Sequence, residues 1–194
     1  MKNVAVTDVL NNRISGGIDI DTAHSNPELQ CINVHCWVLS NDGKSVLLQH
    51  RSPDMYCYPD KYDISLAGHV DADEEPHEAM LREAREEGMV NLRGRLFVPE
   101  GPIYVAEEGA YKTGEKWLHN QLVYVYFAML DKHDIKARAA DEEVGGFEWW
   151  DIDTFALRTI NPTSQQLVPH PDWYFHMVTK KLYELRRIHA KMSA

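Results

Sequence analysis

The chain has little cysteine and no apolar run long enough to span a membrane. Its three cysteines, Cys31, Cys36 and Cys57, are odd in number and lack C-x-x-C spacing, so neither a disulfide framework nor a zinc site is indicated. We interpret them as buried or incidental thiols. The first residues also lack the apolar core of a signal peptide, so we expect a cytoplasmic location and no membrane partner.

Basic residues are also few: 20 Lys and Arg stand against 30 Asp and Glu, which gives a formal net charge of −10. This balance argues against nucleic acid as a partner, because binding the phosphate backbone requires clustered cations. A phosphorylated small molecule would have to be attracted by a bound cation and a few local Lys or Arg side chains. With 194 residues, of which 44% are hydrophobic, the chain can bury the core of one domain with an appendage.

The pattern of apolar residues divides the chain into three parts. We expect an extended N-terminal extension over 1–30, a packed domain over 31–158 and a C-terminal helical segment over 159–194. Strands are predicted at 31–39, 44–50, 62–67, 92–97, 102–106, 118–130 and 147–150, a turn or loop at 107–115, and helices at 76–87, from 151 and at 172–191. This order predicts an α/β protein, an α/β/α sandwich with a mixed sheet and a C-terminal helix.

Local signals support two of these elements. Asn41-Asp42-Gly43 separates the first two strands and is typical of a hairpin. The last helix carries an apolar stripe, which we expect to dock on the core of the same chain or to pair with a second copy in a homodimer. The residues expected to make this contact are Trp173, Met177, Leu182 and Leu185.

The most informative stretch begins at Gly68 and places Glu74 after five residues and Arg82 after seven more. Glu83, Glu86 and Glu87 follow at i, i+3 and i+4, so they share one face of a helix, where like charges repel. A bound cation would offset this repulsion, and carboxylate oxygens suit Mg²⁺ or Mn²⁺. Acidic helices are often simply solvated, but the glycine and glutamate at fixed distances before the helix favour a metal site.

This stretch resembles the signature of the Nudix family, G-x5-E-x7-R-E-U-x-E-E-x-G-U, where U is aliphatic. Residue types and spacing agree up to Glu87. The family has one residue between the last glutamate and a glycine, whereas here Gly88 follows Glu87 directly. Either the turn is one residue shorter, or Gly88 fills the variable place and Met89 stands where glycine is normal. The resemblance implies the α/β/α sandwich of the family.

Residues 48–54, 58–63 and 68–70, with 142–144 and 147–149, look like a Nudix branch that is similar to isopentenyl-diphosphate isomerase. Some members of that branch isomerise a prenyl diphosphate and others hydrolyse a diphosphate bond. The isomerase needs a cysteine where this chain has Ala67, and two glutamates where it has His119 and Gln121. Alanine relays no proton, so hydrolysis is expected. Isomerisation and a non-catalytic ligand-binding module are the alternatives; the complete glutamate set argues against the module.

The resemblance also implies roles for individual residues. A metal-activated water would attack one phosphorus of the diphosphate. Arg82 would bind and orient one of the signature glutamates or Glu74 without touching the metal itself. The expected metal ligands are Glu83, Glu86, Glu87 and the backbone carbonyl of Gly68. The general base is Glu83 or Glu86, or else an acid from a later loop, with Glu143 ahead of Glu142 and Glu108. For the loop acids, an ordinary solvated carboxylate is the competing interpretation.

The substrate is expected to be a small-molecule diphosphate, such as a nucleoside diphosphate linked to another moiety. In an acidic protein its phosphates need local cations, and a base needs aromatic rings to stack on. The candidate phosphate ligands are Arg51, Lys61 and Lys112, and the candidate stacking residues are Tyr56, Tyr58 and Trp117. The motif includes His69, for which anchoring of the loop is the competing interpretation, and packing is the competing interpretation for each of the aromatic residues.

Overall fold

The structure is a computed structural model that describes residues 3–55, 57–97, 99–110, 116–136, 143–160 and 166–192. Its centre is a mixed sheet of eight strands built around β4 (Leu29–Ser40), in which every residue is buried. Along one edge β4 pairs in parallel with β9 (Lys116–Leu130), from Cys31 opposite Gln121 to Ser40 opposite Leu130. Because both faces of the sheet are covered, apolar residues of β4 such as Trp37, Val38 and Leu39 follow one another instead of alternating with exposed polar residues.

Three strands share the other edge of β4, all antiparallel to it: β2 (Val6–Asp8), β7 (Leu66–His69) and β5 (Ser45–Arg51). The sheet continues beyond β5 with β10 (Val144–Asp151) and β6 (Tyr62–Asp63), and beyond β9 with β8 (Glu100–Ala110). The hairpin between β4 and β5 forms as predicted, with Gly43 at φ 69° donating its N–H to Ser40 at 2.8 Å.

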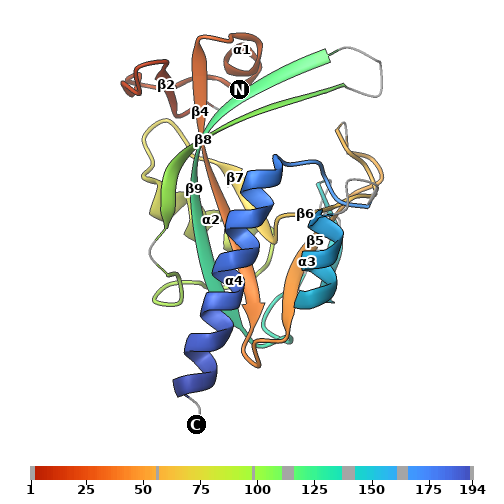
Figure 1. Ribbon diagram of the computed structural model, residues 1–194. Helices are drawn as coiled ribbons and strands as arrows, with labels where there is room; N and C mark the ends of the chain where they lie inside the picture. The colour runs from red at the N-terminus through yellow and green to blue at the C-terminus, as the bar shows by residue number, and fades with distance from the viewer. Residues whose placement is uncertain are drawn as a thin grey trace.

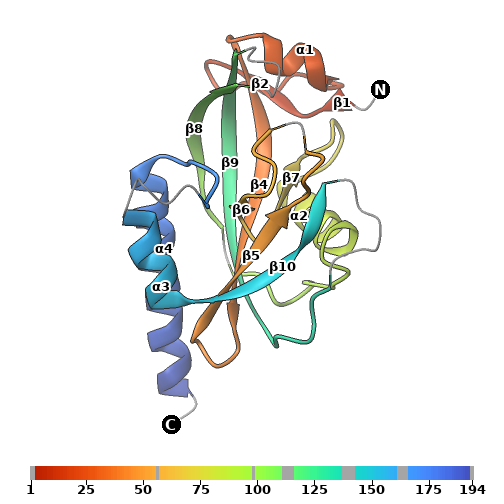
Figure 2. The ribbon, with the colours of Figure 1, turned by 90° about the vertical axis from the view of Figure 1, so that its right-hand side faces the viewer.

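Helices cover both faces of this sheet. In Figure 2 helix α2 (Pro76–Glu86) lies on one side of the strands, and α3 (Ile152–Ile160) and α4 (Asp172–Met192) lie on the other. Two separate groups of buried apolar side chains correspond to the two layers, one including Met80 and Leu81 of α2 and the other including Phe155 of α3 and Leu182 of α4. The predicted α/β/α sandwich is therefore confirmed.

The last helix begins at Asp172 as predicted and docks along the sheet of its own chain (Figure 1). Leu182 and Leu185 are buried, and Met177 is partly buried against the same core. Trp173 was expected to anchor this contact, and that expectation is wrong because its side chain is 49% exposed. The neighbouring Tyr174 is fully buried instead, and its hydroxyl contacts Trp37 Nε1 at 3.1 Å and His35 Nδ1 at 2.8 Å.

Three expectations about strands differ from the structure. The strand predicted at 62–67 is divided into β6 and β7. Residues 92–97 form no strand, since only Leu96 makes a single bridge, to Ala128. The turn predicted at 107–115 is wrong for 107–110, which continue β8 opposite β9, while 111–115 lie outside the described residues. Charged residues such as Glu107 and Glu108 concealed this extension of the strand.

The N-terminal residues pack more closely than an extended segment and loop would. β1 (Asn3–Val4) pairs with β3 (Ile18–Asp19), and the six-residue helix α1 (Ile20–Ser25) follows directly. The Asp19 carboxylate caps α1 by accepting the N–H of Thr22 at 3.3 Å. A helix this short carries no readable period in the sequence. The boundaries placed at 30 and 158 stay predictions.

Candidate active site

Helix α2 is oriented by its apolar side. Ala79, Met80, Leu81 and Ala84 are all fully buried against the sheet. The 3.6-residue period then brings Glu83 and Glu87 to the side where β7 runs, while Glu86 faces outward. The Glu83 side chain is 12% exposed and that of Glu86 is 51% exposed. We refer to Glu83, Glu86 and Glu87 as the glutamate cluster.

Gly68 of β7 lies directly against Glu83. A Cβ atom added at Gly68 would overlap the Glu83 carboxylate, so only glycine permits this approach. The glycine thus serves close contact with a carboxylate, and it needs no unusual backbone angle to do so. The backbone of β7 at Gly68 and the carboxylate of Glu83 on α2 are therefore in close contact.

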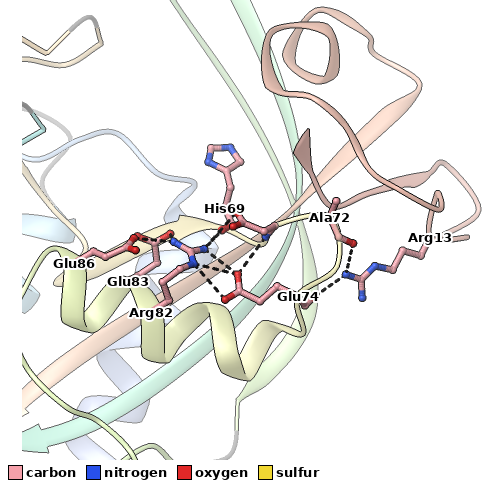
Figure 3. A network of polar contacts seen from close by, with 8 residues as sticks. Arg13, His69, Ala72, Glu74, Arg82, Glu83 and Glu86 are labelled. Atoms are coloured by element: carbon pink, nitrogen blue, oxygen red, sulfur yellow. Dashed lines mark hydrogen bonds and ion pairs between the residues drawn. The ribbon is translucent and has the colours of Figure 1, made fainter. Parts of the chain in front are cut away.

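Arg82 binds the acidic residues on both sides of it (Figure 3). Its Nη1 donates to Glu83 at 2.6 Å and to Glu86 at 3.0 Å, while its Nη2 donates to Glu74 at 3.0 Å and to the carbonyl of His69 at 2.8 Å. Burial by itself would lower the pKa of Arg82, but these hydrogen bonds raise it above its ordinary value. The guanidinium links the helix to the strand that carries Gly68.

Glu87 is the most enclosed member of the glutamate cluster. Its carboxylate accepts hydrogen bonds from the Gln49 side chain and from the N–H of Ala67, both at 3.1 Å. Burial, with the negative charge of Glu83 adding to it, raises the pKa of Glu87 to about 8. Burial and Glu83 disfavour the ionised form of Glu87, and a nearby positive charge would stabilise that form.

The end of α2 decides between the two alignments of the signature. Gly88 does not have a positive φ; Met89 has one, at 50°. Beyond this left-handed residue the N–H of Val90 donates to the carbonyl of Ala84 at 3.0 Å. Gly88 fills the variable place of the signature, and Met89 takes the conformation for which glycine is normal. A Cβ at Gly88 would also press against Leu66 and Ile135 at 3.0–3.1 Å.

A cavity of about 390 Å³ opens beside the glutamate cluster. Glu87 and Gly68 lie in its wall. Of the other residues singled out in the sequence, Arg51, Tyr58 and Glu143 also line it. Lys61 does not appear in the wall; its ammonium lies 5.9 Å from the centre of the Tyr58 ring. Lys112, Tyr56, Glu142 and the side chain of Trp117 lie outside the described residues.

Arg51 is held by two contacts in this wall. It pairs with Asp63 at 3.0 Å and donates to the carbonyl of Cys57 at 3.0 and 3.2 Å. Its guanidinium is therefore fixed in direction, and part of its charge is balanced by Asp63. The Tyr58 hydroxyl reaches the carbonyl of Glu108 at 3.5 Å, which connects the loop after β5 with strand β8.

Asp63 also belongs to a buried arrangement that sequence reasoning missed, formed with Glu107 and His170 and called here the His170 network. His170 lies between the two carboxylates, with Nδ1 2.6 Å from Glu107 and Nε2 3.1 Å from Asp63. Burial would lower the pKa of His170, but the two carboxylates raise it to about 10, so both ring nitrogens donate. Its members come from β6, β8 and the segment before α4, which no local sequence pattern connects.

A second group that sequence reasoning missed consists of His24, Cys31, His69 and His119, called here the histidine cluster. Their possible ligand atoms all lie within 4.8 Å of one another. Nε2 of His24 is 3.1 Å from Nε2 of His69, and the His24 and His119 ring centres are 4.2 Å apart. The three imidazoles line the same cavity as Glu87. The absence of C-x-x-C spacing had argued against such a group, but its residues come from α1, β4, β7 and β9 and meet only in the folded protein.

Residues 29–171 match the family model of the NUDIX domain, which covers most of the chain. The chain belongs to the Nudix family. A curated relative, Nudix hydrolase 3 of Arabidopsis thaliana, is 31% identical over 97 residues, a match that spans 50% of this chain and 12% of the relative. The chain thus corresponds to only a small part of that relative.

Solved structures agree with this Nudix fold. A protein of Deinococcus radiodurans superposes with a TM-score of 0.61 at 16% identity, covering 94% of this chain and 99% of its own. The MutT protein of Methanosarcina mazei Go1 gives a TM-score of 0.55 at 19% identity, covering 78% and 94%. At these identities the likeness concerns the fold alone. None of the helices that the structure describes combines the length and the apolar character needed to cross a membrane.

Proposed function

We propose that this Nudix protein is a pyrophosphohydrolase that depends on Mg²⁺, with Mn²⁺ as a substitute. Its substrate is a nucleoside diphosphate linked to another moiety, or a related organic pyrophosphate. The observation that carries the proposal is the approach of Glu83 and Glu87 to strand β7, where Gly68 and Glu87 line a cavity of about 390 Å³. A cavity of this size suits a small-molecule substrate.

The residues present fit a hard divalent cation. Glu83, Glu86, Glu87 and the carbonyl of Gly68 would hold it, and all of them supply oxygen. The close contact between Gly68 and the Glu83 carboxylate supports this assignment. It is possible only because glycine has no Cβ, which would otherwise occupy the space between them. When bound, the cation neutralises charge on the phosphate oxygens and lowers the pKa of a water molecule.

Arg82 acts in this proposal as a positioning residue. By holding Glu83 and Glu86 from one side, it directs their remaining oxygen atoms away from itself and reduces their mutual repulsion. Glu83 or Glu86 accepts the proton of the attacking water, with Glu143 as the alternative acceptor. Glu143 lines the same cavity as Glu87, and its charge contributes to the raised pKa of Glu87, which supports its inclusion.

Substrate phosphates are assigned to Arg51, and a base or other planar group to Tyr58. The fixed guanidinium of Arg51 in the cavity wall supports the first assignment, although Asp63 shares its charge. Lys61, close to the Tyr58 ring, would add positive charge at the edge of the site. A small-molecule partner in the cytoplasm, no nucleic acid and a possible homodimer belong to the same proposal.

The resemblance to the isomerase branch stays a prediction. It concerns the relationship of the sequences, and we do not propose isomerisation as the reaction. Ala67 lines the cavity and directs its N–H toward Glu87, so no thiol is available at that position. Gln121, where the isomerase has a carboxylate, is held by Asn33 at 2.5 Å and by Glu107 at 3.1 Å. Neither side chain exchanges a proton with carbon, which favours hydrolysis.

The test is a substrate panel of nucleotide sugars, dinucleoside polyphosphates, nucleoside triphosphates and prenyl diphosphates, assayed with Mg²⁺ in ¹⁸O-labelled water. We expect release of a phosphorylated product that carries ¹⁸O from at least one nucleotide substrate. Isopentenyl diphosphate should not be converted to its dimethylallyl isomer. Formation of that isomer at a rate comparable to hydrolysis would reverse the assignment.

A further inference from the structure

We infer that the side-chain oxygen of Asn33 accepts a hydrogen bond from a hydroxyl group of the substrate, which makes Asn33 a specificity-determining residue. Asn33 is buried and lines the cavity, and its Oδ1 has no hydrogen-bond partner among the described residues. A buried acceptor without a donor is destabilising, and a donor from a ligand would remove that cost. This assignment rests on the proposed function, because the diphosphate must first place the attached groups in the cavity.

The register of three neighbouring strands brings Asn33 of β4, Gln121 of β9 and Glu107 of β8 together. Asn33 lies opposite Val123, two residues beyond Gln121, and Gln121 lies opposite Val105, two residues before Glu107. Residues two positions apart in a strand point to the same face of the sheet. The three side chains therefore form one row across that face, called here the polar row, and all three line the cavity.

The hydrogen bonds of the polar row have one consistent direction. Glu107 pairs with His170 at 2.6 Å, and an ionised carboxylate offers only acceptors. Gln121 therefore turns its amide nitrogen to Glu107, at 3.1 Å, and its oxygen to Asn33. The amide nitrogen of Asn33 donates to that oxygen at 2.5 Å. The group left over on Asn33 is its oxygen, so the ligand group that binds there has to be a donor.

The charges beside the polar row favour a neutral donor. Asp63 pairs with Arg51 at 3.0 Å and with His170 at 3.1 Å, while Glu107 pairs with His170. Two negative and two positive side chains thus balance, and an ammonium group would find no excess negative charge among these four residues. The enclosed position of Oδ1 also requires a small group. A hydroxyl group is small and neutral and donates one hydrogen bond.

Two parts of a nucleotide substrate carry such hydroxyl groups: the ribose of the nucleoside, and a sugar or polyol linked to the diphosphate. The competing interpretation is that a water molecule always binds Asn33 and that no substrate group reaches it. Matched ligands separate these cases. ADP-glucose and UDP-glucose are compared with their 2′,3′-dideoxy analogues, which lack the ribose hydroxyls, and with the β-ethyl esters of ADP and UDP, which lack the sugar.

Binding is measured by calorimetric titration of the full chain in the presence of Ca²⁺, which takes oxygen ligands as Mg²⁺ does. We expect one type of analogue to bind at least about tenfold more weakly than the nucleotide sugar, since one lost hydrogen bond in a buried site has about that effect. Weaker binding of the dideoxy analogues assigns the hydroxyl to the ribose. Weaker binding of the ethyl esters assigns it to the linked moiety.

Asn33→Leu connects this preference with the residue, because leucine has a similar volume and no acceptor. The preference of the wild type should fall to within about threefold of equal binding. Gln30→Leu is the matched control, since Gln30 is a buried amide on the same strand that does not line the cavity. It should keep the preference. Asn33→Ser covers the case in which the leucine variant does not fold: it retains a donor for Gln121, but it is too short to replace Oδ1.

The proposal is overturned if the wild type binds all the analogues equally or binds none of the compounds. It is also overturned if a folded Asn33→Leu or Asn33→Ser protein keeps the full preference, or if Gln30→Leu loses it. Hydrolysis of a nucleotide together with any of these results would leave the proposed function intact. Conversely, a preference that depends on Asn33 in a protein that hydrolyses nothing would support the hydroxyl site and contradict the proposed function.

Discussion

The two sides of the cavity are built in different ways. The glutamate cluster comes from about one turn of α2, where helical spacing alone brings the carboxylates together. The histidine cluster and the His170 network each draw residues from several elements, and in the former His24 of α1 meets His119 of β9 only in the folded protein. Functional residues that one helix groups together can be recognised from their spacing in the sequence. Residues that meet through tertiary structure can be recognised only in the folded protein.

The largest effect is expected on turnover, from substitutions in the glutamate cluster. Glu86→Gln and Glu87→Gln should each reduce turnover by on the order of a hundredfold or more, and EDTA should abolish it, because the amide removes a charged ligand of the cation. Turnover of the most reactive substrate is measured at saturating Mg²⁺, with the melting temperature as a check that the fold is intact.

Glu78→Gln is the matched control on the same helix. Glu78 is exposed and its side chain lies 3.8 Å from Arg93, away from the cavity. This variant should keep wild-type turnover. Undiminished turnover of the wild type in EDTA, or of both Glu86→Gln and Glu87→Gln, would contradict a catalytic role for the glutamate cluster.

A smaller effect, on the stability of the fold, is expected from the His170 network. The pKa of His170 is raised to about 10 in the folded protein, above the ordinary 6.5. The stabilisation from its charged form is therefore complete below about pH 6.5 and is lost as the pH rises toward 10. The loss should be on the order of a few kcal/mol in the free energy of unfolding, since one pKa unit corresponds to about 1.4 kcal/mol.

Urea unfolding of the wild type and of His170→Gln at pH 6 and pH 9 measures this contribution. The wild type should lose more stability between the two pH values than the variant, because glutamine does not titrate. His133→Gln, at an exposed position, should behave like the wild type. Equal pH dependence in wild type and His170→Gln would mean that the network holds no extra proton.

The smallest effect concerns the end of the helix. Met89 has φ 50°, a conformation that costs a residue with a Cβ about 1–2 kcal/mol, and its side chain is 60% exposed. Met89→Gly should raise the free energy of unfolding by roughly 0.5 kcal/mol, because the greater freedom of glycine in the unfolded chain offsets part of the gain. Met89→Ala keeps the strain and should give no increase. A gain with alanine as large as with glycine would point to the methionine side chain instead.

The same contrast explains how much of the fold the sequence predicts. The sandwich, the first hairpin, α2 and α4 follow from periodicity, from Asn41-Asp42-Gly43 and from a proline in the first turn. Short or charged elements do not: α1 has six residues, and β8 includes Glu107 and Glu108. Trp173 was misplaced because a stripe defined by spacing does not decide between neighbours, and Tyr174 makes the buried hydrogen bonds.

For the candidate site, the sequence predicts residues that a single motif spaces and misses those that pair across strands. The proximity of Gly68, Arg82 and Glu83 follows from one stretch of chain, although their catalytic roles stay predictions. The position of His119 beside His24 depends on the register of β9 against β4, where Gln121 lies opposite Cys31. A shift of this register by one residue would turn His119 to the other face of the sheet.

The parallel pairing of β4 with β9 has a consequence for how the chain is made. The strands meet from Cys31 with Gln121 to Ser40 with Leu130, and the helix that carries the glutamate cluster lies in the stretch between them. A ribosome must therefore synthesise α2 and β8 before the central strand gains its longest neighbour. Until then an apolar edge stays unpaired, which slows folding and invites association between nascent chains. A fragment that ends before residue 116 should not form the sheet, even though it contains the entire signature.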